Sequence, residues 1–268
     1  QRQMCIRDRP AAEALMMDIY EPVGDTETER PLFMFFHSGN FLPPMVNGGT
    51  QGTRTDNTVV EMCERYARMG YVTAAVSYRL GWNPTAGTQE ERTLQLIQAA
   101  YRGVQDSRTA VRFFRKSAAE DGNPYGIDPD KVAMAGDGTG GYVTLASSTI
   151  SDFNDIIIDD EGNPIDKFWY DDDGDGILTP MVVEALHGNP DGTTDTPLCM
   201  SNHVGYSSDF SFQMNMGGAL GDLNWLDEGD MPMVSFHSPH VQYGTNITIL
   251  PALQGMPPAA EALMMDIY

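Results

Sequence analysis

The stretch Val132–Ala146 reads VAMAGDGTGGYVTLA, with a cluster of glycines between two apolar segments. The first segment is short and continuously apolar, as in a buried strand. The second has its apolar residues at helical spacing. Glycines between such segments mark a tight connection. The stretch therefore predicts a strand, a sharp turn and a helix.

Gly136, Gly138 and Gly140 give this turn the spacing GxGxG. The pattern resembles GxSxG, the nucleophile elbow of α/β-hydrolases, in which the serine sits exposed on a strained strand-to-helix turn. The resemblance implies that Gly136 and Gly140 fill the two glycine positions, where strand and helix pack closely. It also implies that Gly138 occupies the nucleophile position and has no side chain with which to attack a substrate.

A dinucleotide-binding loop is the alternative interpretation of the same glycines. GxGxxG would run from Gly136 to Gly141. Such a loop is normally followed, about 20 residues later, by an acidic residue after a second strand. Asp155 lies near that distance, but it follows a predicted helix and Ser151–Asn154 rather than a strand. We therefore favour the hydrolase elbow.

Three segments before the elbow strengthen the resemblance to the bacterial carboxylesterase branch of the α/β-hydrolases. LMMDIYEP at Leu15–Pro22 resembles the LDVYxP segment that opens many of these enzymes. HSGNF at His37–Phe41 resembles their HGGGF loop, and GYVTAAVSYRLG at Gly70–Gly81 resembles the segment before their long crossover helix. The order and spacing of these segments imply the same fold.

In the HGGGF loop of esterases, backbone N–H groups form half of an oxyanion hole. The resemblance implies that Gly39 and Asn40 take this role here, together with Thr139 after the elbow. Two of the three usual glycines are replaced, by Ser38 and Asn40, so an ordinary turn is the alternative. The loop directly follows the apolar run Pro31–Phe36, and this position favours the esterase interpretation.

Alternating strands and helices predict an α/β fold with a doubly wound, mostly parallel sheet, as in α/β-hydrolases. The residues from Tyr125 to Lys131 are expected to form a loop before the elbow strand. Helical spacing predicts one helix over Asn57–Arg68, ended by Gly70, and a long one from Thr93. The predicted strands are Ala14–Tyr20, Pro31–Phe36, Tyr71–Tyr78, Val132–Ala135, Phe210–Met216 and Met231–Phe236.

The composition excludes several classes of partner. Of 268 residues, 16 are Lys or Arg and 38 are Asp or Glu, a formal net charge of -22. Nucleic acids and anionic lipid surfaces would be repelled. No apolar run reaches the roughly 18 residues of a membrane span. The acidity is typical of a solvated surface in salt or outside the cell, so we expect an extracellular or periplasmic protein, although no signal peptide is visible.

The two ends of the sequence are unusual. Residues 1–9 show neither strand nor helix periodicity, and we interpret them as a non-native end. The segment PAAEALMMDIY occurs at Pro10–Tyr20 and again, unchanged, at Pro258–Tyr268. We interpret residues 258–268 as an artefactual duplicate of residues 10–20. The prediction is one α/β-hydrolase-like domain over residues 10–257, incomplete at its C-terminal side.

An acidic insertion over residues 151–207 contains a second motif. Asp171, Asp173 and Asp175, with Gly176 next, match the first half of a calcium loop, in which alternate carboxylates converge on one ion. The twelfth position is Val182 rather than the usual glutamate. The three aspartates could therefore bind Ca²⁺ weakly, and a solvated acidic turn is the alternative.

The rest of a catalytic triad is not evident. In this fold an acid and then a histidine follow the nucleophile in sequence. The expected acid position, after Phe236, is followed by HSPHVQYGTNITILP, which contains no Asp or Glu, and no histidine follows His240. His237 resembles a structural histidine of esterases. A hydroxyl without a base is a poor nucleophile at neutral pH.

These observations predict a carboxylesterase-like domain that is inactive as written, with a pocket for a small ester or another small ligand. Two alternatives remain open. One is an active carboxylic-ester hydrolase whose sequence is truncated or misread at position 138. The other is a secreted calcium-binding interaction domain.

Overall fold

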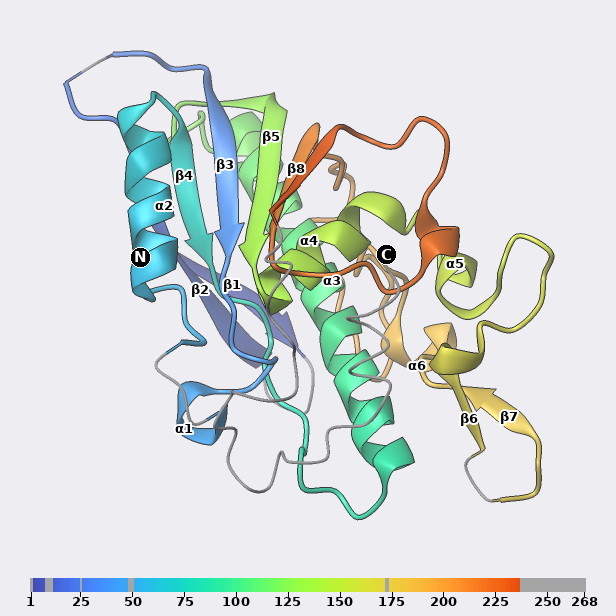
Figure 1. Ribbon diagram of the computed structural model, residues 1–268. Helices are drawn as coiled ribbons and strands as arrows, with labels where there is room; N and C mark the ends of the chain where they lie inside the picture. The colour runs from blue at the N-terminus through green and yellow to red at the C-terminus, as the bar shows by residue number, and fades with distance from the viewer. Residues whose placement is uncertain (1, 8–11, 25, 48–50, 172–173, 237–268) are drawn as a thin grey trace.

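A twisted sheet forms the centre of the molecule, with helices on both faces (Figure 1). The computed structural model describes residues 2–7, 12–24, 26–47, 51–171 and 174–236. In this part of the chain the sheet has seven strands, in the order β1-β2-β4-β3-β5-β8-β9. Their bounds are β1 Arg2–Arg7, β2 Ala12–Tyr20, β3 Arg30–Phe36, β4 Val72–Val76, β5 Ile127–Asp137, β8 Phe212–Met216 and β9 Met233–Phe236.

The predicted sheet is confirmed. All six expected segments contribute strands to it, and β4, β3, β5, β8 and β9 run parallel to one another. β2 is antiparallel to β4, and β1 is antiparallel to β2. The continuously apolar β3 has five consecutive buried residues, Leu32–Phe36, as expected of a central strand covered on both faces.

Two boundaries differ from the prediction. Residues 2–7 form an edge strand, although they were excluded from the fold for lack of periodicity. Strand pairing uses backbone N–H and C=O groups, so an edge strand can form without an alternating side-chain pattern. β5 begins at Ile127 rather than Val132, because Ile127 and Asp128 of the expected loop pair with Arg30 and Pro31 before an irregularity in the ladder.

The helices cover the sheet as the alternating pattern predicts. α2 (Asn57–Arg68) lies on one face, and α3 (Gln89–Glu120) and α4 (Thr139–Thr149) lie on the other (Figure 1). α2 has the predicted bounds, and Gly70 follows it with a φ of 97°. α3 begins before Thr93 because the Thr88 side chain accepts a hydrogen bond from the backbone N–H of Glu91, at 3.1 Å, and caps the helix.

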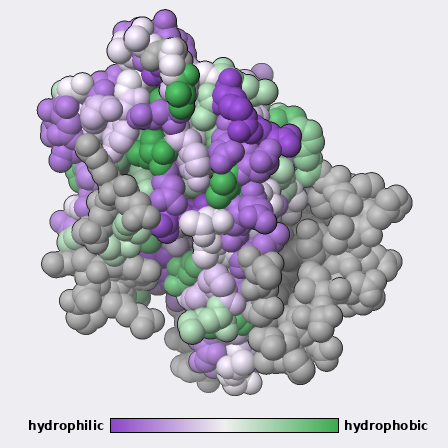
Figure 2. Space-filling view, turned by 90° about the vertical axis from the view of Figure 1, so that its left-hand side faces the viewer, coloured by the Kyte–Doolittle hydropathy of each residue, from purple (hydrophilic) through white to green (hydrophobic). Residues whose placement is uncertain are grey.

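The outer surface on the α2 side is mostly hydrophilic, with small and separate hydrophobic areas (Figure 2). On the inner side of α2, Val59, Cys63 and Ala67 are buried against the sheet. Its outer side has Glu61 paired with Arg65 and Glu64 paired with Arg68. This division is the one that an amphipathic surface helix requires.

Short elements make up the insertion that follows α4 and the connection to β9. They are α5 (Asn154–Ile157), η1 (Asp166–Phe168), β6 (Trp169–Asp171), β7 (Leu178–Pro180), α6 (Glu184–His187) and η2 (Leu223–Trp225), and α1 (Pro44–Asn47) lies earlier in the chain. The insertion shares a hydrophobic core with α3 and α4. Ile156, Phe168 and Val182 pack there with Tyr101 and Leu145.

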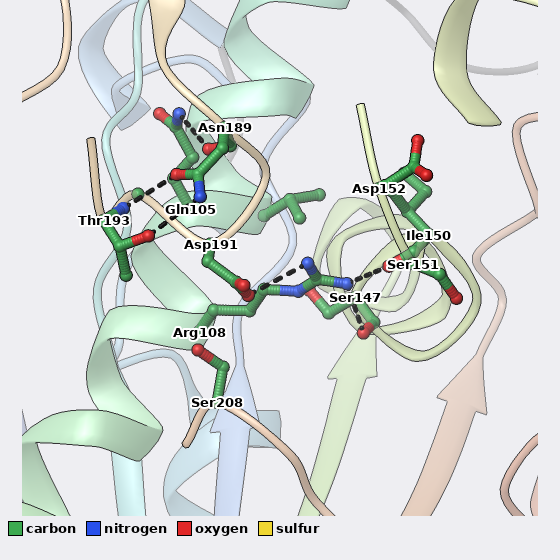
Figure 3. Close-up of polar contacts among 12 residues, drawn as sticks. Gln105, Arg108, Ser147, Ile150, Ser151, Asp152, Asn189, Asp191, Thr193 and Ser208 are labelled. Carbon is green, nitrogen blue, oxygen red and sulfur yellow. Dashed lines mark hydrogen bonds and ion pairs between the residues drawn. The ribbon is translucent and has the colours of Figure 1, made fainter. Parts of the chain in front are cut away.

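Arg108 of α3 fastens the insertion to the main domain (Figure 3). Its guanidinium donates to the backbone carbonyls of Ser147 and Ile150 at the C-terminal end of α4, and it pairs with Asp191 of the insertion at 3.1 Å. A cation at this helix end also complements the helix dipole. Gln105, one turn earlier on α3, donates to the carbonyls of His187 and Asn189. Residues 184–191 are thus held against α3 by buried polar contacts.

Candidate functional site

The turn at Gly138 connects the end of β5 to the first residue of α4. Gly138 has φ 52° and ψ −117°, a conformation that is strained for residues with a side chain. Its backbone N–H donates to the carbonyl of Met216, at the end of the neighbouring strand β8, at 2.9 Å. The turn therefore lies at the carboxyl edge of the parallel strands, where α/β folds bind their ligands.

Gly136 and Gly140 allow strand and helix to approach closely. A Cβ atom on Gly136 would overlap the backbone of Gly140, and a Cβ atom on Gly140 would overlap the backbone of Phe36. Both contacts would fall under the 3.0 Å that real Cβ atoms keep. These two glycines therefore meet the packing requirement that a nucleophile elbow places on its flanking positions.

Three hydrogen bonds to its backbone carbonyl groups hold the HSGNF loop in place. Tyr78 Oη donates to the carbonyl of His37 at 2.7 Å, Trp82 Nε1 to that of Asn40 at 2.8 Å, and the Gly81 N–H to that of Phe41 at 2.7 Å. Asn40 and Phe41 both have positive φ, 58° and 54°. Because each peptide unit is planar, fixing a carbonyl group also fixes the direction of the N–H group in the same unit. An oxyanion hole requires N–H groups with fixed directions.

The structure brings this loop to the elbow. The Ser38 side chain lies over Gly138, so a Cβ atom on Gly138 would overlap Ser38 Oγ. Tyr78 Oη connects the two segments, since it donates to the His37 carbonyl and lies 3.1 Å from Thr139 Oγ1. Thr139 and the residues around Gly39 thus meet at one place. The oxyanion-hole role of Gly39, Asn40 and Thr139 stays a prediction.

The contact between Ser38 and Gly138 was not foreseen from the sequence. The signal was present, because the loop has a serine where esterases have a glycine and the elbow has a glycine where they have a serine. Each replacement was interpreted separately. Only the fold shows that the two positions face each other.

Two titratable groups lie beside the elbow, Asp137 and His37. Burial raises the pKa of the Asp137 carboxyl, and the negative charge of Asp56 raises it further. Burial lowers the pKa of His37. The His37 ring stacks on Tyr78, with centroids 4.6 Å apart, and its Nδ1 lies 2.6 Å from the carbonyl oxygen of Ser38. His37 therefore supports the loop.

The other histidines of the described residues have structural contacts elsewhere. His187 Nδ1 lies 3.0 Å from the backbone nitrogen of Val183, to which the ring is hydrogen-bonded. His203 packs edge-on against Phe113. His237, His240 and the expected acid position after Phe236 lie outside the described residues.

The acidic motif forms the turn of the hairpin between β6 and β7. Asp171 accepts hydrogen bonds from the N–H groups of Gly174 and Gly176, at 2.8 and 2.9 Å, and Asp175 accepts one from Ile177 at 2.7 Å. Asp173 lies outside the described residues. Among the residues that are described, no three Asp, Glu, His or Cys side chains are grouped closely enough to hold a metal ion.

The residues after the hairpin restrict a possible calcium shell. Val182, at the twelfth position of the motif, is 1% exposed and belongs to the core shared with α3. Glu184 is the first residue of α6. Val182 therefore supplies no side-chain ligand at the twelfth position, which suits weak binding.

Comparison with known proteins identifies one family. Residues 17–167 match the model of a family described as BD-FAE. No curated protein matches the chain. Within the part of the chain that the structure describes, no helix is both long and apolar enough to cross a membrane.

The chain is also similar to solved structures of an esterase from Thermogutta terrifontis. Esterase 2 phosphorylated by paraoxon is 18% identical, with a TM-score of 0.47 and coverage of 88% of this chain and 70% of that chain. The apo form of the same esterase is 17% identical, with a TM-score of 0.47 and coverage of 88% and 71%.

Proposed function

Because the chain belongs to the BD-FAE family, an α/β-hydrolase-type esterase family, we propose that it binds a small ester-like molecule without hydrolysing it through a serine nucleophile. The domain is esterase-like in fold. One observation supports the proposal: the residue in this strained strand-to-helix turn is Gly138, which has no side chain. Without a side chain there, no covalent acyl intermediate can form at the elbow.

We expect the full chain to show little p-nitrophenyl acetate hydrolysis above background. The Gly138→Ser variant should also show no burst, because none of the contacts among the described residues provides a base for the serine proton. Any residual rate of the Gly138→Ser variant should come from oxyanion donors and substrate binding alone, which accelerate a reaction by at most roughly 10³ to 10⁴ over water. Release of p-nitrophenol, followed with heat-unfolded protein as the control, measures both rates.

An active hydrolase would give a different result in the same assay. Wild-type turnover on the order of 10 per second, a typical enzyme value, would contradict the proposal. It would show that another residue of the chain acts as the nucleophile with an acid and a base of its own. The active-hydrolase alternative would then be preferred.

For the β6–β7 hairpin we propose weak binding of Ca²⁺, independent of the ester site. The supporting observation is that Asp171 is oriented by two backbone N–H groups around the turn at Gly176, whose φ is 85°. A glycine at this sixth position makes the sharp turn of a calcium loop. Alternate carboxylates repel one another until a cation joins them.

Titration calorimetry with CaCl₂ should show binding between about micromolar and millimolar Kd. The signal should disappear in Asp173→Ala, because the loop loses a central carboxylate. Glu161→Ala is the matched control, since it removes the same charge from an exposed turn of the same insertion. An absence of heat in the wild type, or an equal loss in both variants, would leave a solvated acidic turn.

A further inference from the structure

Ser38 fills the space that a side chain at position 138 would need. A Cβ atom on Gly138 would overlap Ser38 Oγ and would lie 3.2 Å from Ser38 Cβ. The overlap involves only the Ser38 side chain at short range, since the next atom, Ser38 Cα, lies 3.9 Å away. A side chain at position 138 would therefore displace the Ser38 hydroxyl from its place in this arrangement.

The Ser38 side chain is partly exposed to solvent. Ser38 is half-buried, and its Oγ makes no hydrogen bond to any residue that the structure describes. A serine hydroxyl can donate one hydrogen bond and accept others. The adjacent backbone is rigid, because Tyr78 and Trp82 hold the carbonyls on either side of it. The hydroxyl group beside the elbow therefore comes from Ser38 of the HSGNF loop and not from position 138 of the turn.

We propose that Ser38 supplies the hydroxyl group of this site and that it binds the carbonyl oxygen of a neutral ester by a hydrogen bond. This inference rests on the proposed function of the same site, and it adds the residue that contacts the ligand and the charge of that ligand. The inference concerns binding alone and involves no covalent step.

The charges around the elbow favour a neutral ligand over a carboxylate. Asp137 directly precedes Gly138 and is close enough to Asp56 for the charge of Asp56 to act on it. Arg54, the nearby cation, is paired with Asp18 at 2.9 Å. The whole chain has a net charge of -22. An anion would be repelled by this field, whereas an ester carbonyl carries no net charge.

A cycle of variants tests the contact between the two positions. We expect Gly138→Ser to lower the melting temperature by about 5 °C or more, given roughly 2–4 °C per kcal/mol for a chain of this size. Adding Ser38→Gly should recover most of that loss, because the overlap disappears and only the backbone strain at positive φ remains. Gly122→Ser is the matched control, since its φ is 75° and no atom lies within 4 Å of the new Cβ.

Ser38→Gly should not rescue the Gly122→Ser control. If it restores both variants equally, or restores neither, Ser38 does not occupy the space over Gly138 and the inference is wrong. This outcome leaves the proposed function standing. Ester turnover by the wild type would instead contradict the proposed function, so the two failures are distinguishable.

Binding of ethyl acetate, measured by ligand-observed NMR on the full chain, tests the role of the hydroxyl. We expect Ser38→Ala to bind ethyl acetate roughly fivefold more weakly, because the loss of one hydrogen bond costs about 1 kcal/mol. The melting temperature of this variant should be unchanged. Sodium acetate should bind more weakly than ethyl acetate. Equal ethyl acetate affinity in the wild type and Ser38→Ala, no binding to either, or tighter binding of acetate would each overturn the assignment.

Discussion

Replacing Gly140 with alanine is expected to lower the free energy of unfolding by more than about 4 kcal/mol, in the range that only severe core disruption reaches. The added Cβ would overlap the carbonyl group of Phe36 and lie 2.8 Å from the carbonyl oxygen of His37. These atoms belong to the backbone at the end of β3, a central strand with both faces covered. The strand cannot move away without breaking its ladder to β4 or β5.

Urea unfolding followed by circular dichroism measures this loss. Gly87→Ala is the matched control, because the nearest atom to its new Cβ is the end of the Glu91 side chain at 3.9 Å. The control should stay within about 0.5 kcal/mol of the wild type. A Gly140→Ala variant as stable as that control would show that α4 does not approach β3 as closely as the elbow requires.

The second large effect is expected at Asp106, which lies in the middle of α3 and is fully buried. Asp106 accepts from Arg79 Nε at 2.9 and 3.0 Å and from the Arg79 backbone N–H at 2.7 Å. Asp106→Ala would remove the carboxylate that pairs with the Arg79 guanidinium, which is itself 1% exposed. The free energy of unfolding should fall by about 3–5 kcal/mol.

Two further variants separate charge pairing from packing. Glu61→Ala removes a carboxylate from an exposed pair with Arg65 and should leave the melting temperature nearly unchanged. Arg79→Met combined with Asp106→Leu should be more stable than Asp106→Ala alone, because no unpaired charge stays buried. If the double variant is the less stable of the two, the loss of stability in Asp106→Ala does not come from the buried Arg79 charge.

α3 shows where the sequence-based prediction was incomplete. Its apolar positions correctly indicated a long helix that packs on the sheet. Asp106 and Arg112, which lie off that apolar face, are nevertheless both 0% exposed. Arg112 donates to the carbonyl of Asn202, which lies in the insertion, and to the side chain of Ser208, which directly follows the insertion. Polar residues on a helix predict a solvated face unless another segment covers it, and here the insertion does so.

The sequence by itself determined the class of fold, the order of the strands along the chain, the bounds of α2 and the position of the elbow. These features depend on local patterns, such as apolar runs, helical spacing and glycines that permit a sharp turn. That Gly138 corresponds to a nucleophile position is a prediction from a short motif.

Only the tertiary structure decided which distant residues meet. Ser38 and Gly138 follow different strands of the chain, and their contact exists because β3 and β5 are neighbours and parallel, with Phe36 opposite Gly136. Arg79 reaches Asp106, and Arg108 reaches Asp191, for the same kind of reason. Such contacts depend on how strands and helices pack, which a pattern of neighbouring residues does not encode.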